Sequence, residues 1–391
     1  MKRSRIVLLA ASCGVALLLA GGSVALRVGA AEGAYRDVVL FSELLSLISD
    51  NYVDPVDSDG LLRNAYEGML GNLDANGAFL TPEEVAEWKS GEPSGAASPG
   101  LSMIKAHGSF LVVFVPPGSP AEDAGLARAD QIRKIDGRSS RSLSLAQARR
   151  LLRGESGTSV TVEVLHPGAG WTREVLDLTR TVPTFAPFEL TVQDGIGVLT
   201  IRDLKRLDSG KVAQELDDIR SRGVDRLMVD LRDASEGDPR DAVALVELFA
   251  DDFELRLKDR SGDVVESVKG RADRRAWQGS VAMLVNGATA GGSEAVAALL
   301  QSSVAATVYG EMTYGLGTEA ALFELEDGSG LLFSNALWET AAGKSWNDEG
   351  IEPDETVRGE GPDDELAADQ LNRALESFAA EDAVPAEKKA A

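Results

Sequence analysis

The sequence is poor in the residues that bind metals, cross-link chains or contact nucleic acids. It has one cysteine, Cys13, so no intrachain disulfide can form, and only two histidines, His107 and His166. No group of Cys, His and Asp has metal-ligand spacing, and we expect no metal and no other cofactor. A formal charge of −24 argues against a nucleic-acid partner, because phosphate binding needs clustered Lys and Arg.

The N-terminus has the composition of a targeting segment. Basic residues precede an apolar stretch from Ile6 to Leu26, and small residues follow it. Residues 1–30 are therefore predicted to be either a cleaved signal peptide or an inner-membrane anchor of about bilayer length. Either alternative exports the rest of the chain to the periplasm, the cell envelope or the medium. Cys13 is a poor lipidation site, because the apolar run continues past it.

Changes in composition divide the remaining chain. Apolar residues at helical spacing predict helices in residues 31–90, and a stretch rich in Gly, Ser and Pro predicts a linker at 91–99. Strand patterns with glycine turns follow in residues 100–181, and mixed strands and helices in residues 182–359. Residues 360–391 are acidic and rich in alanine, which is typical of a tail.

The segment from Val281 to Ala320 has the most informative pattern. An apolar run of strand length is followed by a turn of Asn, Gly and small residues, a helical run from Ser293, a second strand and a glycine-rich turn. Enzymes place nucleophiles at strand-to-helix turns, because the side chain is exposed there and backbone N–H groups point at a developing oxyanion. In this chain the turn consists mostly of Gly and Ala.

Two motifs in this segment carry a family resemblance. Asn286 and Glu294 have the spacing of N-x-x-S-A-S-A-S-E, and Thr313-Tyr314-Gly315 and Gly317 that of G-x-x-T-F-G-K-G. Both motifs resemble those of the C-terminal processing peptidases, or tail-specific serine proteases. Three further segments share the resemblance: Leu73–Glu84, Asp230-Leu231-Arg232 and Gly343–Pro353. The resemblance implies an α+β multidomain fold with a helical N-terminal region, a β-rich PDZ-like domain and a mixed α/β protease core of the ClpP/crotonase-like type.

The catalytic positions of the family pattern are not kept. The nucleophilic Ser falls on Gly291, the general-base Lys on Leu316 and the supporting Gln on Ala320. A Ser/Lys dyad needs a hydroxyl beside a neutral amine, and neither Gly nor Leu supplies one. Where the family has the glycine pair of its oxyanion hole, this chain has Glu236 and Gly237. A carboxylate there would repel an oxyanion.

Two hydroxyls near Gly291 are alternative nucleophiles. Ser293 and Thr289 each lie two residues away, but no Lys or His is near them in sequence. The other interpretation is a hydroxyl in the first helical turn for Ser293 and a helix N-cap for Thr289. The same turn lacks the Lys of a phosphate-binding loop. His107 and His166 stand in turn-like segments, and we expect both to be solvated.

Residues 100–181 resemble a PDZ domain, notably in Gly118-Ser119-Pro120-Ala121 and in the stretch from Asp130 to Gly137. Such a domain captures a peptide as an added strand and holds its terminal carboxylate with backbone N–H groups. The resemblance assigns peptide binding to six residues in the first loop and strand and on the helix: Leu101, Ser102, Met103, Ile104, Ala148 and Leu152. The alternative is an architectural domain with an occluded groove.

Together these observations predict an exported pseudoprotease that binds polypeptide C-termini, or that regulates or scaffolds an active paralogous protease. The resemblance also implies contacts through residues 31–90, with that protease or with a second copy of the chain. There are two alternatives. One is an active serine endopeptidase whose nucleophile has moved to Ser293 or Thr289. The other is a purely structural envelope protein.

Overall fold

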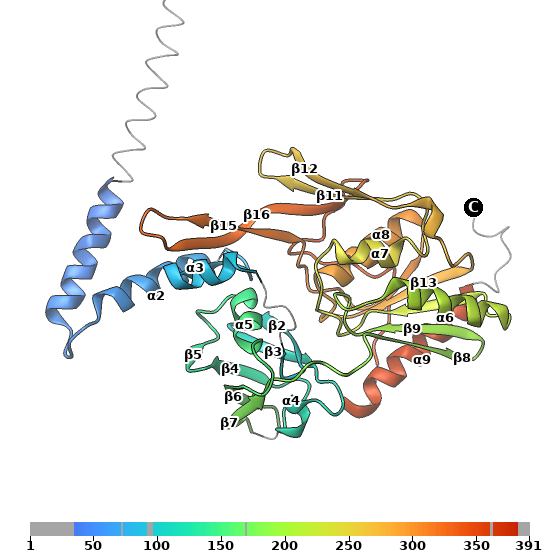
Figure 1. The fold of residues 1–391 in the computed structure, drawn as a ribbon, viewed down its shortest axis with the longest axis horizontal. Coiled ribbons are helices and arrows are strands. Elements are labelled where there is room, and N and C mark those ends of the chain that lie inside the picture. The colour runs from blue at the N-terminus through green and yellow to red at the C-terminus, as the bar shows by residue number, and fades with distance from the viewer. Residues whose placement is uncertain (1–34, 72, 92–96, 169, 360–362, 382–391) are drawn as a thin grey trace, which may run out of the picture. The chain divides into compact units, whose positions relative to one another are not determined.

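The computed structural model describes residues 35–71, 73–91, 97–168, 170–359 and 363–381 (Figure 1). The chain forms two compact units that divide between Ala65 and Tyr66. The targeting segment predicted at residues 1–30 lies outside the described residues, as do most of the linker and both ends of the acidic tail. Within the described ranges, no helix has both the length and the apolar character needed to span a bilayer.

The first unit is helical, as the apolar spacing predicts. Residues 35–51 form one helix, and α2 (Ser58–Gly71) begins after a short break. The helix at 35–51 exposes a series of large apolar side chains: Tyr35, Val38, Val39, Leu40, Phe41, Leu44, Leu47 and Ile48. This helix therefore presents an exposed apolar surface.

The second unit begins within α2, at Tyr66, and continues with a short strand and helix. Thr81 caps α3 (Pro82–Lys89) with a capping box, in which its hydroxyl accepts from Glu84 N and the Glu84 carboxylate accepts from Thr81 N. β1 (Ala78–Leu80) pairs with β16 (Gly330–Thr340) in an antiparallel register. A segment expected to be helical thus contributes an edge strand to a sheet of order β1-β16-β11-β12. The other strands of this sheet are β11 (Glu254–Asp259), β12 (Val264–Lys269) and β15 (Thr318–Glu324), which pairs with β16.

A second sheet, of order β2-β3-β4-β6-β7, forms the PDZ-like region. Its strands are β2 (Ser102–Ala106), β3 (Ser109–Phe114), β4 (Gln131–Ile135), β5 (Arg138–Ser139), β6 (Ser159–His166) and β7 (Thr172–Thr179). The helices α4 (Pro120–Asp123) and α5 (Leu145–Leu152) accompany it. Phe110, Ile132 and Leu145 are buried in its core. The strand β2 ends the sheet, and its side away from β3 faces α5 across a groove described below.

The third sheet carries the candidate site. Its order is β17-β14-β13-β10-β9-β8, and all neighbouring pairs are parallel except β8 with β9. The strands are β8 (Phe188–Gln193), β9 (Ile196–Ile201), β10 (Arg226–Asp230), β13 (Ser280–Val285), β14 (Thr307–Gly310) and β17 (Glu355–Thr356). The central strands are continuous apolar runs, because both faces of the sheet are covered.

Helices cover the two faces of this sheet (Figure 1). The helices α6 (Ser209–Ser221), α7 (Asp241–Val246) and α8 (Gly292–Ser303) pack on one face, and α9 (Asp363–Glu381) on the other. A 3-10 turn, η1, spans Ala272–Arg274. The predicted α+β multidomain class is confirmed. Because β10, β13 and β14 are parallel neighbours, the loops after them leave the sheet at one edge.

Candidate functional site

Three loops meet at the carboxyl edge of the parallel sheet, after β10, β13 and β14. Backbone hydrogen bonds join them: Ala290 N donates to Ala234 O at 3.1 Å, and Tyr314 N donates to Thr289 O at 3.0 Å. Gly292 N also donates to Gly237 O at 3.1 Å. The loop that carries the predicted oxyanion region and the loops predicted to carry nucleophile and base therefore form one rigid assembly.

Gly291 occupies the sharp turn between β13 and α8. Its φ of 59° and ψ of −116° form a strained elbow that glycine adopts without the clash of a Cβ atom. A Cβ atom at Gly291 would lie 3.8 Å from Leu316 Cδ2 and 3.1 Å from Gly237 O. The structure thus brings together the positions that the resemblance assigns to nucleophile and base. Neither residue carries a nucleophilic or proton-accepting atom.

Glu294 holds the elbow and the base-bearing loop together. Its carboxylate is fully buried and accepts hydrogen bonds from Gly291 N at 3.0 Å, Leu316 N at 2.8 Å and Gly315 N at 2.6 Å. The Thr313 hydroxyl is a fourth donor at 2.5 Å. Burial raises the pKa of Glu294 to about 7, while the four donors lower it. One side chain in the first turn of α8 therefore sets the distance between the two vestigial catalytic positions.

A cleft of about 760 Å³ opens at this edge of the sheet. All three vestigial positions, Gly291, Leu316 and Ala320, line it, together with Glu236 and Gly237. Its wall also carries four basic side chains, Arg149, Arg150, Arg153 and Lys205. The positions predicted from sequence to form one site thus share one cavity. Charged side chains line this cavity, and the elbow at Gly291 carries no nucleophile.

The carboxylate of Glu236 is turned toward α5 of the PDZ-like region. Arg149 Nε lies 3.3 Å from Glu236 Oε1, and Arg153 Nη2 lies 3.5 Å from Oε2. Arg149 Nη2 donates to Ser235 O at 2.6 Å. The negative charge predicted for the oxyanion region is present, and two guanidinium groups pair with it. Sequence reasoning missed both arginines, of which Arg149 lies in α5 and Arg153 is the residue that caps its C-terminus.

Neither alternative nucleophile reaches the cleft. Ser293 and Thr289 are both 0% exposed, and neither lines the cavity. The Thr289 hydroxyl accepts from Asn286 N at 3.1 Å and donates to Leu231 O at 2.8 Å. Thr289 is therefore not the N-cap that was expected, since Gly291 occupies that position of α8. Ser293 lies in the first turn of α8, as its alternative interpretation had it.

The burial of these two hydroxyls gives a matched test. Ser293 Oγ has no hydrogen-bond partner among the described residues, so Ser293→Ala is expected to change the free energy of unfolding by less than about 1 kcal/mol. Thr289→Val leaves the buried Asn286 N–H without an acceptor and removes one of the two donors to Leu231 O, which still accepts from Ala234 N at 3.3 Å. It is expected to cost about 1–3 kcal/mol. Urea denaturation of both variants would measure the difference. A large loss of unfolding free energy in Ser293→Ala would contradict the absence of a hydrogen bond from its hydroxyl among the described residues.

Neither histidine contributes to the cleft. His107 is exposed in the β2–β3 turn. His166 is not solvated as expected, because it is only 21% exposed and its Nδ1 lies 2.9 Å from the buried Asp130 carboxylate. Among the residues with described positions, no cluster of three or more His, Cys, Asp or Glu could hold a metal ion.

A second cavity, of about 400 Å³, lies between the first PDZ-like strand and α5. Four of the six predicted peptide-binding residues line it: Leu101, Ser102, Met103 and Leu152. The other two do not. Ile104 packs against Ala288 and Ala290 of the elbow loop, and Ala148 is fully buried in the core of the PDZ-like region. Residues of the following segment, which sequence reasoning did not include, close the groove: Val182, Pro183, Phe185, Asp203, Lys205 and Arg206.

The base position is also a packing contact. Leu316 packs against the apolar core of the PDZ-like region and against the cluster of Ile104, Ala288 and Ala290. The Tyr314 hydroxyl donates to Lys105 O of β2 at 2.6 Å. A leucine here thus contributes apolar contact between the two regions, where a lysine side chain would place an amine.

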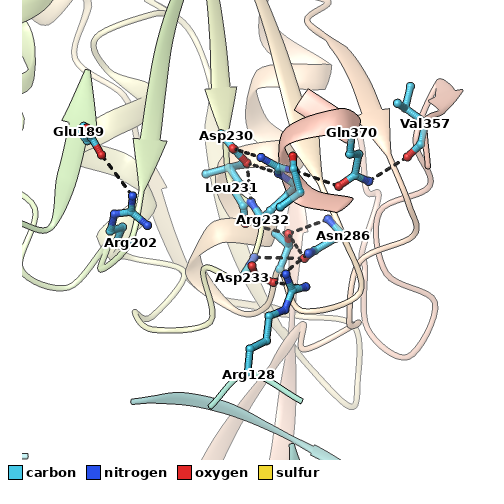
Figure 2. A network of polar contacts seen from close by, with 12 residues as sticks. Arg128, Glu189, Arg202, Asp230, Leu231, Arg232, Asp233, Asn286, Val357 and Gln370 are labelled. Atoms are coloured by element: carbon cyan, nitrogen blue, oxygen red, sulfur yellow. Dashed lines mark hydrogen bonds and ion pairs between the residues drawn. The ribbon is translucent and has the colours of Figure 1, made fainter. Parts of the chain in front are cut away.

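A polar network behind the cleft links three parts of the second unit (Figure 2). Asp233, which has a positive φ of 61°, pairs with Arg128 of the PDZ-like region at 3.1 Å and accepts from Asn286 Nδ2 at 2.9 Å. Burial raises the pKa of Asp233, and Arg128 opposes that rise. Arg232 binds Asp230 through two hydrogen bonds, of 2.9 and 2.7 Å, and donates to Ala367 O of α9. The network thus connects the loop that ends at Glu236 to the PDZ-like region through Arg128 and to α9 through Ala367.

Comparisons with known proteins agree with this architecture. Residues 195–357 match the family model described as peptidase family S41, and residues 112–165 match the PDZ domain. The chain is 29% identical over 322 residues to the carboxy-terminal processing protease CtpA of Bacillus subtilis (strain 168), covering 81% of this chain and 67% of that protein. It is 28% identical over 314 residues to a probable CtpA-like serine protease of Staphylococcus aureus (strain COL), covering 80% and 63%.

Among solved structures, the photosystem II D1 C-terminal processing protease is similar, with a TM-score of 0.61 and 25% identity. That match covers 82% of this chain and 92% of the other. The chain spans about two thirds of the length of the two curated relatives above. The matched peptidase region contains Gly291, Leu316 and Glu236 of the cleft, and the matched PDZ region contains Arg149 and Arg153, whereas Leu101, Ser102 and Met103 of the groove lie outside both. Residues 195–357 thus carry a peptidase family S41 domain and residues 112–165 a PDZ domain, the combination that the resemblance to the C-terminal processing peptidases implies.

Proposed function

We propose that this chain is a pseudoprotease that binds polypeptide C-termini without cleaving them. The observation that carries the proposal is the pairing of Gly291 with Leu316 across an intact elbow. Acyl transfer by a Ser/Lys dyad requires a hydroxyl and a neutral amine at these two points. Removal of one member of a serine catalytic unit costs about as much as removal of all of them.

The peptide groove supports retained binding. Its lining includes the apolar side chains of Leu101, Met103, Leu152 and Phe185, and also basic side chains, of which Arg149, Arg153 and Lys205 border the cleft as well. An extended peptide can add to the edge of β2, and its terminal carboxylate is complementary to positive charge. The relatives above are named as C-terminal processing proteases, which is consistent with a C-terminal ligand for this chain.

A second role is compatible with binding. The exposed apolar helix at residues 35–51 is suited to contact an active paralogous protease or a second copy of the chain, so that the protein would regulate or scaffold another enzyme. We place these events in the cell envelope, after export directed by residues 1–30, with the chain either released or held at the membrane by that segment.

The rival function is an active serine endopeptidase that uses Ser293 or Thr289. Both hydroxyls are buried outside the cleft, and Thr289 is fully hydrogen-bonded. Their use would require the elbow to unfold, which would also break the hydrogen bonds of Glu294. We therefore favour the pseudoprotease.

One experiment separates the two functions. The purified full chain is incubated with an unfolded, fluorescein-labelled protein and, separately, with a fluorophosphonate probe. We expect no cleavage above the rate without protein and no labelled residue. Peptides with a free α-carboxylate should bind in a calorimeter. Cleavage that Ser293→Ala or Thr289→Val abolishes would overturn the proposal, and failure of every C-terminal peptide to bind would favour a purely structural role.

A further inference from the structure

We infer that Glu236 is an internal competitor for the terminal carboxylate of a bound polypeptide, an inference that rests on the proposed C-terminus binding. In the structure Glu236 pairs with Arg149 and Arg153. A peptide carboxylate that enters the groove takes over the same two guanidinium groups and displaces Glu236.

The first observation is the shared lining of groove and cleft. Arg149, Arg153, Lys205 and Glu236 line both cavities, so these four charged side chains form the boundary between them. A ligand carboxylate at the basic end of the groove and the carboxylate of Glu236 therefore act on the same positive charges. Two anions on one pair of guanidinium groups repel each other, and binding of one weakens binding of the other.

The second observation is the loose geometry of the existing contacts. The ion pairs of Glu236 measure 3.3 and 3.5 Å, longer than the 2.7–2.9 Å that is typical of a tight charge-assisted bond. Arg149 Nε is buried and has no hydrogen-bond partner within the described part of the chain. The Glu236 side chain remains 17% exposed. Glu236 thus pairs with both arginines at long distances and leaves Arg149 Nε without a hydrogen bond to any described residue, so a better placed carboxylate can replace it.

The third observation excludes the neighbouring cations from the same role. Arg206 binds Asp203 at 2.7 Å and stacks on the Phe185 ring at 4.2 Å. Arg150 donates to the backbone carbonyl of Glu87 and lies 3.8 Å from its carboxylate. Arg206 and Arg150 are thus engaged by groups other than Glu236, whereas Arg149 and Arg153 contact Glu236 at 3.3 and 3.5 Å.

Displacement has a consequence for the cleft. When Glu236 loses its arginines, its charge is left beside Gly237 and Gly291, on the wall of the vestigial active site. Occupation of the groove thus changes the electrostatic potential of the cleft, although no catalytic group is present. The ligand is a polypeptide C-terminus with an apolar last side chain, because apolar residues form the groove around the basic end.

The test compares two probes on the full chain by fluorescence anisotropy. One is a fluorescein-labelled decapeptide that ends in Ala-Val-Leu with a free α-carboxylate, and the other is the same peptide with an amidated end. Glu236→Gln keeps the shape of the side chain and removes its charge. We expect this variant to bind the free-carboxylate peptide about tenfold more tightly than the wild type does, and the amidated peptide within about twofold.

Two further variants serve as controls. Glu87→Gln removes a negative charge from the same cleft but from a partner of Arg150, and it should leave both affinities within about twofold. Arg153→Gln should weaken the free-carboxylate peptide about fivefold, and adding Glu236→Gln to it should then restore little. Circular dichroism verifies that each variant is folded.

The outcomes separate the inference from the function on which it rests. If the wild type prefers the free carboxylate and Glu236→Gln does not change that preference, the competition is refuted while C-terminus binding stands. An equal gain for both peptides would also refute it, because a general charge effect would then explain the result. If neither the wild type nor Glu236→Gln binds either peptide, the proposed function itself fails.

Discussion

Replacing Glu294 with Gln is expected to lower the free energy of unfolding by about 2–5 kcal/mol. The wild-type carboxylate accepts four hydrogen bonds, three of them from backbone N–H groups that have no freedom to turn away. An amide has one oxygen, so its NH₂ group must face at least one of these donors. Each buried N–H left without an acceptor costs about 1–3 kcal/mol, and the charge assistance is lost as well.

The measurement is urea denaturation followed by tryptophan fluorescence, with Glu311→Gln as the matched control. Glu311 lies on the loop after β14, the loop that also carries Leu316. It is 45% exposed and pairs with the exposed Arg358. Loss of a surface ion pair costs at most about 1 kcal/mol. Should Glu294→Gln be as stable as the control variant, the buried carboxylate would not be the element that joins the elbow to the loop at Leu316.

How far the sequence predicts the fold is clearest at two strands. The apolar run of Val281–Val285 is long, and β13 is found there, because a parallel strand buried on both faces needs a continuous apolar segment. β1, at Ala78–Leu80, was expected to be part of a helical region. Three residues carry no periodic signal, and this strand exists because Ala78 pairs with Leu332, far along the chain. The residues next to Ala78 in the sequence cannot reveal a contact with a segment about 250 residues away.

In the candidate site, too, the sequence predicted some features and could not predict others. Motif spacing located Gly291, Leu316 and Ala320, since these positions follow fixed strands of the family pattern, and all three line one cleft. Spacing could not show that Ala148 points into the core, because a small apolar residue on a helix suits a groove and a core equally. Nor could it pair Glu236 with Arg149, since that contact joins two domains. Charge complementarity between distant segments becomes visible only in the folded chain.

Rebuilding the dyad is expected to give the largest change in activity. We expect the triple variant Gly291→Ser, Leu316→Lys and Ala320→Gln to remain close to the wild type in cleavage of an unfolded protein. Adding Glu236→Gly should raise cleavage at least about a hundredfold above background, because Glu236 keeps a nearby amine protonated and repels an oxyanion. A Cβ atom at Gly291 would face Leu316 at 3.8 Å but would also approach Gly237 O to 3.1 Å at a φ of 59°, so the serine is introduced at a cost in backbone strain. The partly buried Leu316 site would desolvate an amine and lower its pKa.

Two controls make this prediction decisive. The quadruple variant with Gly291→Ala in place of Gly291→Ser must fall to background, which assigns the cleavage to the introduced hydroxyl. Loss of Leu316 from its apolar contacts costs about 1–3 kcal/mol, so folding of each variant has to be verified by circular dichroism and thermal denaturation. A folded quadruple variant without cleavage would mean that the elbow has drifted from catalytic geometry as well as losing its side chains. Cleavage would mean that only side chains were lost, and that Glu294 still holds the backbone where catalysis needs it.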